Sequence, residues 1–150
     1  MQNENDIQIV VVDDGSTDGT KDGIQNKYPE ITVLNGTGSL FWTGAVSFGV
    51  NHILNICNKD DWILLVNNDI QMAKNVISKL VSFSLSRERH VVVSALSVDM
   101  IDKDTIIKSG TKVVSWALNR TKHIYHGSSL KSLLSNDVVE VDLLTGRCLL

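Results

Sequence analysis

Residues 7–20 read IQIVVVDDGSTDGT, and this stretch contains the clearest strand of the chain. Its run of apolar, mostly β-branched residues predicts a strand over Ile7–Asp13 that is covered on both faces, as in a parallel sheet. The glycine, serine, threonine and aspartate residues that follow are typical of a turn and a helix start. We therefore interpret this stretch as the beginning of a strand–helix–strand unit.

The same alternation continues along the chain. Helices are predicted over Thr17–Lys27, Thr43–Asn58 and Ala73–Leu85, further strands over Ile31–Leu34, Asp61–Val66, Val91–Leu96 and Val138–Leu143, an edge or hairpin region over Asp99–Leu118, and a polar loop over Lys122–Ser129. Strands and helices that alternate with short connections predict one α/β domain over residues 1–150, with a mainly parallel sheet. In such folds the ligand lies beyond the carboxyl ends of the strands.

Composition excludes several classes of protein. The net charge of −3 argues against binding to nucleic acid, which requires a basic excess. No apolar run approaches the ~20 residues that span a bilayer, and the polar Met1–Asp6 does not look like a signal peptide. Cys57 and Cys148 stand in apolar contexts, which predicts buried free thiols in a reducing, cytoplasmic compartment.

The first candidate cluster is Asp13, Asp14 and Gly15 at the end of the first strand. Adjacent carboxylates there can accept hydrogen bonds from a base or a ribose, and the next helix start can lie near a phosphate. The structural alternative is that these residues only form turns and helix caps. A calcium loop is a further alternative, on the residues Asp14, Ser16, Asp18, Gly19 and Gln25. It is disfavoured because glutamine replaces the bidentate glutamate and because a strand precedes it.

The second cluster, NGTGSLFWTG at residues 35–44, lies between a predicted strand and a predicted helix. Gly36 and Gly38 nearly match a dinucleotide-binding fingerprint, but Phe41 occupies the position of its third glycine. Glycines let the backbone approach a ligand closely, and Trp42 can pack on a sugar or a base. We expect Phe41 to be inserted into the core.

The third cluster, LLVNND at residues 64–69, delivers oxygen-bearing side chains to the end of an apolar strand. Hard cations such as Mg²⁺ and Mn²⁺ prefer carboxylate and amide oxygens, and they keep several waters. Asp69 can hold such an ion, with Asn67 beside it. The alternative is that Asp69 only precedes or caps the next helix.

Taken in this order and spacing, the clusters resemble those of nucleotide-sugar glycosyltransferases of the GT-A fold, specifically glycosyltransferase family 2 and its rhamnosyltransferase-like members. VVDDGSTDGT (11–20) is similar to the family's second-strand motif, and NGTGSLFWTGAVSFGVN (35–51) to its donor loop. DWILLVNNDI (61–70) is similar to its metal-binding strand, with Asn67 where the family often has its first aspartate. VDLLTGRC (141–148) is similar to the segment under the acceptor site.

The resemblance implies a Rossmann-like three-layer α/β/α sandwich with a mainly parallel sheet. It implies an inverting transfer from a nucleotide-diphosphate sugar to a glycan or lipid-linked saccharide acceptor, in polysaccharide assembly. Asp14, with Asp13 beside it, would contact the nucleotide, and Asp69 with Asn67 would hold Mg²⁺ or Mn²⁺. The donor would be bordered by Gly15, Gly36, Gly38, Trp42 and Asn68.

Two departures from the family pattern concern the ends of the chain. Only Met1–Asp6 precedes the strand that is second in the family, so the usual central first strand is expected to be absent. Either Ile7–Asp13 then pairs directly with the strand at Trp62–Val66, or another chain fills the gap, as in a homo-oligomer. The family's catalytic carboxylate follows the TGRCLL-type segment, and neither Glu140 nor Asp142 stands there. We thus expect a chain truncated at both ends without a general base, cytoplasmic or peripheral at the inner face of the membrane. The alternative function is a non-catalytic nucleotide-binding or assembly module.

Overall fold

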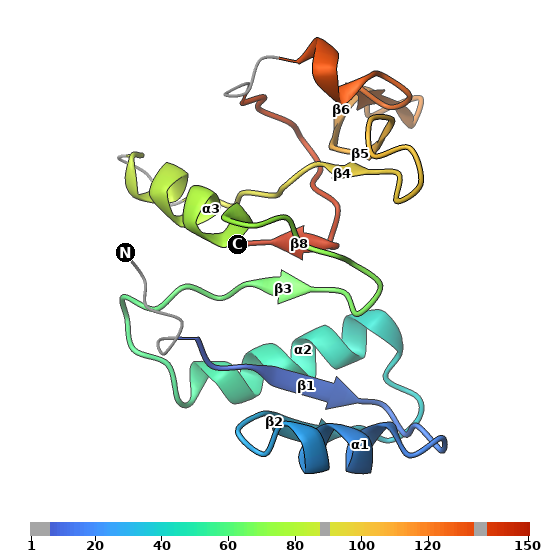
Figure 1. The fold of residues 1–150 in the computed structure, drawn as a ribbon. Coiled ribbons are helices and arrows are strands. Elements are labelled where there is room, and N and C mark those ends of the chain that lie inside the picture. Colours follow the sequence, from blue (N-terminus) through green and yellow to red (C-terminus); the bar gives the residue numbers. More distant parts are fainter. Residues whose placement is uncertain (1–6, 88–90, 134–137) are drawn as a thin grey trace. The chain divides into compact units, whose positions relative to one another are not determined.

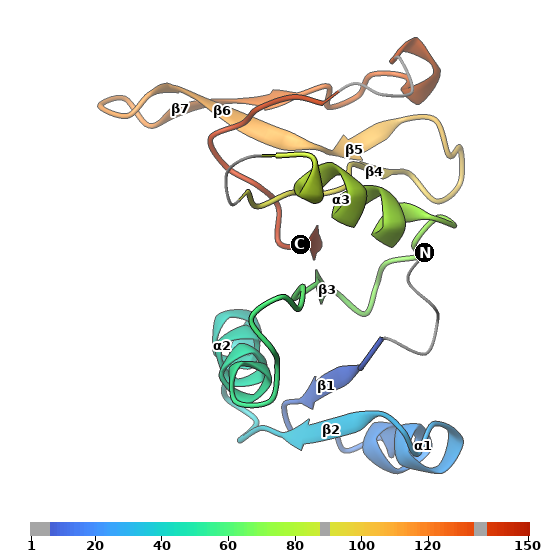
Figure 2. The same ribbon diagram turned by 90° about the vertical axis from the view of Figure 1, so that its left-hand side faces the viewer.

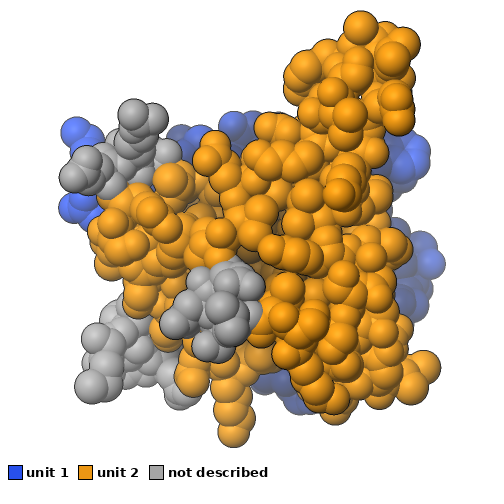
Figure 3. Space-filling view, turned by 90° about the horizontal axis from the view of Figure 1, so that it is seen from above, with its two compact units in different colours: residues 1–61 blue, residues 62–150 orange. Residues whose placement is uncertain are grey.

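The computed structural model describes residues 7–87, 91–133 and 138–150. The chain divides into two compact units, Met1–Asp61 (unit 1) and Trp62–Leu150 (unit 2). Figure 3 shows unit 1 in blue and unit 2 in orange. That residues 1–150 act as a single domain stays a prediction.

Unit 1 is a strand–helix–strand–helix segment (Figure 1). Its elements are β1 (Val10–Asp13), α1 (Thr20–Lys27), β2 (Thr32–Asn35) and α2 (Phe41–Leu54). β1 and β2 are parallel, in a register that runs from Val10 opposite Thr32 to Asp13 opposite Asn35. The carboxyl ends of both strands therefore lie side by side, which confirms the predicted strand–helix–strand unit.

Both helices of unit 1 differ from their predicted bounds, and the start of α1 has a local reason. α1 begins at Thr20, not Thr17, because Gly19 has a left-handed backbone (φ 83°) and the Asp18 carboxylate accepts hydrogen bonds from the N–H and hydroxyl of Thr20. α2 begins at Phe41, two residues before the predicted start.

α2 packs closely against β1 at the buried Gly49, where an added Cβ would lie 3.1 Å from the Val12 side chain.

Unit 2 is built mainly from antiparallel strand pairs. Its elements are β3 (Leu65–Val66), α3 (Val76–Leu85), β4 (Ser97–Val98), β5 (Ile106–Lys108), β6 (Gly110–Ser115), β7 (Arg120–Ile124), the short 3₁₀ helix η2 (Leu130–Ser132) and β8 (Cys148–Leu149). β3 pairs with β8, β4 with β5 and β6 with β7, each pair antiparallel. The hydrophobic core of the unit joins α3 to the chain end through Leu80, Val81, Cys148 and Leu150.

The prediction of a mainly parallel sheet is not confirmed in the described residues, where β1 and β2 form the parallel pair and three other pairs are antiparallel. The predicted strand Val91–Leu96 does not form along its length. Instead, Val93 and Leu150 exchange two backbone hydrogen bonds of 2.9 Å. The predicted strand Val138–Leu143 is reduced to a bridge between Leu143 and Thr111. The predicted hairpin region is confirmed by β4–β5 and β6. The loop expected over Lys122–Ser129 begins later than predicted, since Lys122–Ile124 belong to β7 and residues 125–129 lie outside the strands.

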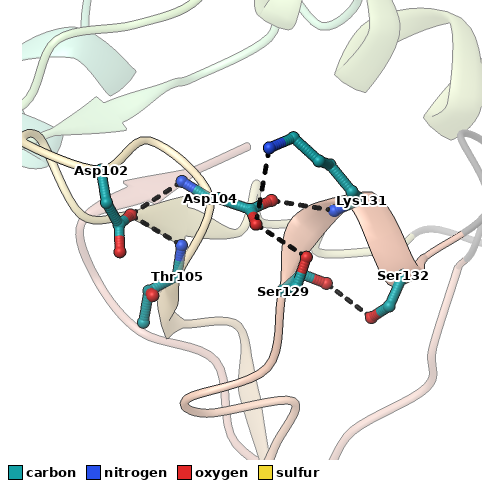
Figure 4. A network of polar contacts seen from close by, with 6 residues as sticks. All are labelled: Asp102, Asp104, Thr105, Ser129, Lys131 and Ser132. Atoms are coloured by element: carbon teal, nitrogen blue, oxygen red, sulfur yellow. Dashed lines mark hydrogen bonds and ion pairs between the residues drawn. The ribbon is translucent and has the colours of Figure 1, made fainter.

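A polar network ties the β4–β5 connection to η2 (Figure 4). The Asp102 carboxylate accepts hydrogen bonds of 2.8 Å from the N–H groups of Asp104 and Thr105. The Asp104 carboxylate accepts from the Ser129 hydroxyl (2.8 Å) and the Lys131 N–H (3.1 Å), and the Lys131 ammonium lies 3.8 Å away. Hydrogen bonds from the side chain and the backbone of Thr105 lower the pKa of Asp102, and those from Ser129 and Lys131 lower the pKa of Asp104.

Both cysteines are free thiols, and Cys148 is buried as predicted, whereas Cys57 is half-buried. Burial raises the pKa of the Cys148 thiol. Within the described part of the chain, no helix combines the length and the hydropathy that a membrane crossing requires.

Candidate functional site

The first aspartate after β1, Asp13, is buried and turned toward its own loop. Its carboxylate accepts a 2.9 Å hydrogen bond from the Ser16 N–H, and its carbonyl accepts one of 2.7 Å from the Gly36 N–H. Hydrogen bonds from the side chain and the backbone of Ser16 lower the pKa of Asp13. Asp13 therefore orders the β1 loop and, through its backbone, extends the pairing of β1 with β2.

The second aspartate, Asp14, reaches across to the glycine-rich loop after β2. One carboxylate oxygen accepts a 2.8 Å hydrogen bond from the Gly38 N–H. The other accepts from the N–H groups of Leu40 (2.7 Å) and Phe41 (3.2 Å), which are among the first amides of α2. A helix start leaves these amides without partners inside the helix, and an anion there is also favoured by the helix dipole. Since no side chain of the N-cap residue fills that role, Asp14 caps α2 from 26 residues away.

Three glycines allow the two loops to approach so closely. A Cβ on Gly36 would lie 2.4 Å from an oxygen of the Asp14 carboxylate and 2.9 Å from the Asp14 Cα. A Cβ on Gly15 would lie 3.1 Å from the Gly38 Cα, and both residues have left-handed backbones, with φ of 86° and 82°. The predicted residues Asp13, Asp14, Gly15, Gly36 and Gly38 are thus brought together in unit 1. We call this cluster the Asp14 clamp.

We predict that Gly36→Ala destabilises the protein by about 1–3 kcal/mol, because the new methyl group collides with Asp14 and with the Leu40 side chain. The matched control is Gly23→Ala in α1, where an added Cβ meets nothing within 4 Å. That change should stabilise the protein by about 0.5–1 kcal/mol, since alanine is the better helix former. Urea unfolding measures both effects. Equal effects of the two substitutions would contradict the tight contact at Gly36.

Two aromatic residues at the start of α2 stand beside the Asp14 clamp. The expectation that Phe41 enters the core was wrong, because its side chain is 82% exposed. Its φ of 52° is a strained conformation for a bulky residue, and the hydrogen bond from its N–H to Asp14 holds it there. Trp42 is 52% exposed. A large aromatic surface is therefore available next to the glycine-rich loop.

The candidate metal ligands are carried by unit 2, directly after β3. The Asn67 N–H donates a 3.0 Å hydrogen bond to the Arg147 carbonyl, which holds the end of the strand to the segment before β8. Asn67 is half-buried, whereas Asn68 and Asp69 are exposed. One carboxylate and two amides follow one another in the sequence here, and those of Asn68 and Asp69 are exposed. These residue types suit a hard cation that keeps waters or takes further ligands from a substrate.

Residues 7–87, 91–133 and 138–150 contain no group of three or more histidine, cysteine, aspartate or glutamate side chains that could hold a metal ion. A cation at Asp69 would therefore need further oxygen ligands from amide side chains, water or a substrate. A metal role for Asn67 and Asp69, and a donor contact for Asn68, stay predictions.

The partners of Asp14 were missed by the sequence analysis. They are backbone amides of residues 38, 40 and 41, so residue type carries no direct signal for them. The available signal was indirect: an aspartate pair after one strand and glycines after the neighbouring parallel strand. The carboxyl ends of such strands meet at one edge of a sheet.

This chain is similar in sequence to known proteins over much of its length. The family model "Glycosyl transferase family 2" matches residues 1–134. N-acetylglucosaminyl-diphospho-decaprenol L-rhamnosyltransferase of Mycobacterium tuberculosis, from two strains, is 26% identical over 86 residues. The match covers 53% of this chain but 28% of the relative's length. No solved structure matches the chain significantly. Because the family match extends over most of the sequence, the chain belongs to glycosyltransferase family 2.

Proposed function

We propose that the chain binds a nucleotide-diphosphate sugar and forms the donor-binding part of an inverting, metal-dependent glycosyltransferase. The observation that carries this proposal is the Asp14 clamp, which joins the DDGS motif after β1 to the glycine-rich loop after β2. The clamp leaves the backbone of Gly38 exposed on the glycine-rich loop, with Trp42 at the start of the helix that follows. A nucleotide sugar could approach the backbone closely there.

Asp14 retains capacity for a ligand. An ionised carboxylate offers about four lone-pair sites, and three hydrogen bonds from the backbone occupy three of them. We propose that the remaining site accepts a hydrogen bond from the base or ribose of the donor. Asp13 and Gly15 would shape the same binding surface through the loop after β1.

Asp69, supported by Asn67, would hold Mg²⁺ or Mn²⁺ against the diphosphate of the donor, with Asn68 bordering the donor. Such an ion, when bound, neutralises the charge that develops on the leaving diphosphate. The chain's own net charge of −3 would otherwise repel an anionic donor. The exposed carboxylate of Asp69 is suited to this task because a substrate can reach it.

The acceptor in this proposal is a glycan or a lipid-linked saccharide. The name of the mycobacterial relative describes a rhamnosyl transfer involving a diphospho-decaprenol-linked sugar, and lipid-linked acceptors are our extension to this chain. Inversion requires a carboxylate that takes the proton of the acceptor hydroxyl while that oxygen attacks opposite the leaving group. We assign this base to none of the described residues.

The test is calorimetric titration of the chain with UDP, GDP, dTDP and their sugar conjugates, with and without Mn²⁺. We expect one of these nucleotides to bind at one site per chain, more tightly when Mn²⁺ is present. Failure of all of them to bind under both conditions would contradict the proposal. Binding that ignores the ion would contradict its metal-dependent part alone. NAD serves as the control for the dinucleotide alternative and is expected not to bind.

A further inference from the structure

Unit 2 carries a long hairpin that the donor site does not use. β6 and β7 run side by side to a turn that lies away from α3 and from β3 (Figure 2). All of residues 116–123 are exposed. At the turn the side chains of Trp116 and Leu118 are 78% and 70% exposed, and Val114 just before it is 60% exposed. Water-exposed apolar groups of this size at a turn indicate a contact surface.

The same hairpin concentrates positive charge. Residues 105–133 contain Lys108, Lys112, Arg120, Lys122 and Lys131 and no aspartate or glutamate, although the whole chain is acidic. Lys112 lies directly opposite Lys122 in the β6–β7 register. Arg120 is two residues before Lys122 on the same strand and so shares its face.

This arrangement is unfavourable for the isolated hairpin, because like charges directly opposite each other in a sheet repel. Among the described residues, none of the cations Lys112, Arg120 and Lys122 forms an ion pair; the ion pair found in this unit joins Lys131 to Asp104. The neighbouring carboxylate of Asp142 accepts a 2.7 Å hydrogen bond from the Val113 N–H. The three charges are therefore available to an anionic partner.

We propose that the β6–β7 hairpin docks onto an anionic lipid surface. In this arrangement Trp116 and Leu118 enter the headgroup region, while Lys112, Arg120 and Lys122 contact lipid phosphates. An amphipathic tryptophan is favoured at a membrane interface, and long cationic side chains keep their charge at headgroup level. A nucleic acid would satisfy the charges but not the aliphatic groups, whereas a lipid surface also accepts the leucine and valine beside the tryptophan.

The experiment measures binding of the full chain to vesicles of phosphatidylcholine with and without phosphatidylglycerol, by co-sedimentation. We expect binding to the anionic vesicles, weakened by added salt. Each basic residue near the surface contributes about fivefold in affinity, so Arg120→Gln with Lys122→Gln should weaken binding about twenty-five-fold. Lys59→Gln with Lys79→Gln removes the same charge from exposed positions elsewhere and should have little effect.

The apolar part of the proposal is tested separately. Trp116→Ser should weaken vesicle binding about tenfold. It should also remove the fluorescence quenching that brominated lipid chains cause in the unsubstituted protein. Ile101→Ser is the matched control, since Ile101 is 94% exposed in a different turn. Thermal unfolding confirms that each variant is folded.

Three binding results would overturn the proposal. They are absence of binding to anionic vesicles, equal weakening by both pairs of charge substitutions, and hairpin-dependent binding to a single-stranded oligonucleotide without quenching by brominated lipid. A fourth outcome is a dimer of the unsubstituted chain, seen by light scattering, that Trp116→Ser disrupts while no vesicle binding is found. The partner of the hairpin would then be a second copy of the chain and not a lipid surface. None of these outcomes affects nucleotide binding in unit 1, so the two proposals fail independently.

Discussion

Replacing Asp14 with alanine is expected to destabilise the protein by about 2 kcal/mol and to weaken nucleotide binding about tenfold or more. The substitution removes both acceptor oxygens from the N–H groups of Gly38, Leu40 and Phe41. The start of α2 then loses its cap, and the glycine-rich loop loses its link to β1. Urea unfolding measures the first effect, and calorimetric titration with whichever of UDP, GDP and dTDP binds the unsubstituted chain measures the second.

Hydrogen exchange distinguishes this role of Asp14 from a purely ligand-binding one. In Asp14→Ala the amides of residues 38, 40 and 41 should exchange faster in the absence of any nucleotide. Asp22→Ala, which removes an exposed carboxylate from the first turn of α1, is the matched control and should leave these amides unchanged. Unchanged exchange in Asp14→Ala, together with weaker nucleotide binding, would mean that Asp14 only contacts the ligand.

Replacing Asp69 with alanine is expected to remove the effect of Mn²⁺ on nucleotide binding, while the affinity measured without the ion stays nearly the same. Asp69 is an exposed carboxylate, so its removal leaves no buried group unpaired and should change the stability by less than about 0.5 kcal/mol. A metal ion that neutralises a diphosphate contributes several kcal/mol, which corresponds to about a hundredfold or more in affinity or rate. Titration with and without Mn²⁺ gives both values.

The control for this prediction is Asp60→Ala, which removes another exposed carboxylate and the same charge. It should retain the full Mn²⁺ effect. If Asp69→Ala and Asp60→Ala respond to Mn²⁺ alike, Asp69 does not hold the ion. In that event Asp69 would be an ordinary exposed residue of the segment before α3, whose N-cap is Asn75.

The sequence was most informative where interactions are local. The β-branched run before Asp13 and the turn residues after it predicted β1, α1 and β2 as a parallel strand–helix–strand unit, and the structure confirms it. The start of α1 was misplaced by three residues because a left-handed Gly19 and the Asp18 side chain, not the apolar periodicity, set that boundary. Residues Lys122–Ile124 of β7 were assigned to a loop, since the polar residues of this strand lack the apolar alternation that identifies a half-buried strand.

For the candidate site, residue types alone placed Asp14, Gly36 and Gly38 at neighbouring strand ends. The sequence by itself determined which chemical groups this edge offers, because strand ends and glycine spacing are local properties. Only the tertiary structure decided that the Asp14 carboxylate binds backbone amides 24 to 27 residues away, and that Phe41 is exposed. The physical reason is that such contacts depend on how two loops close and pack, and backbone amides are the same in every residue except proline.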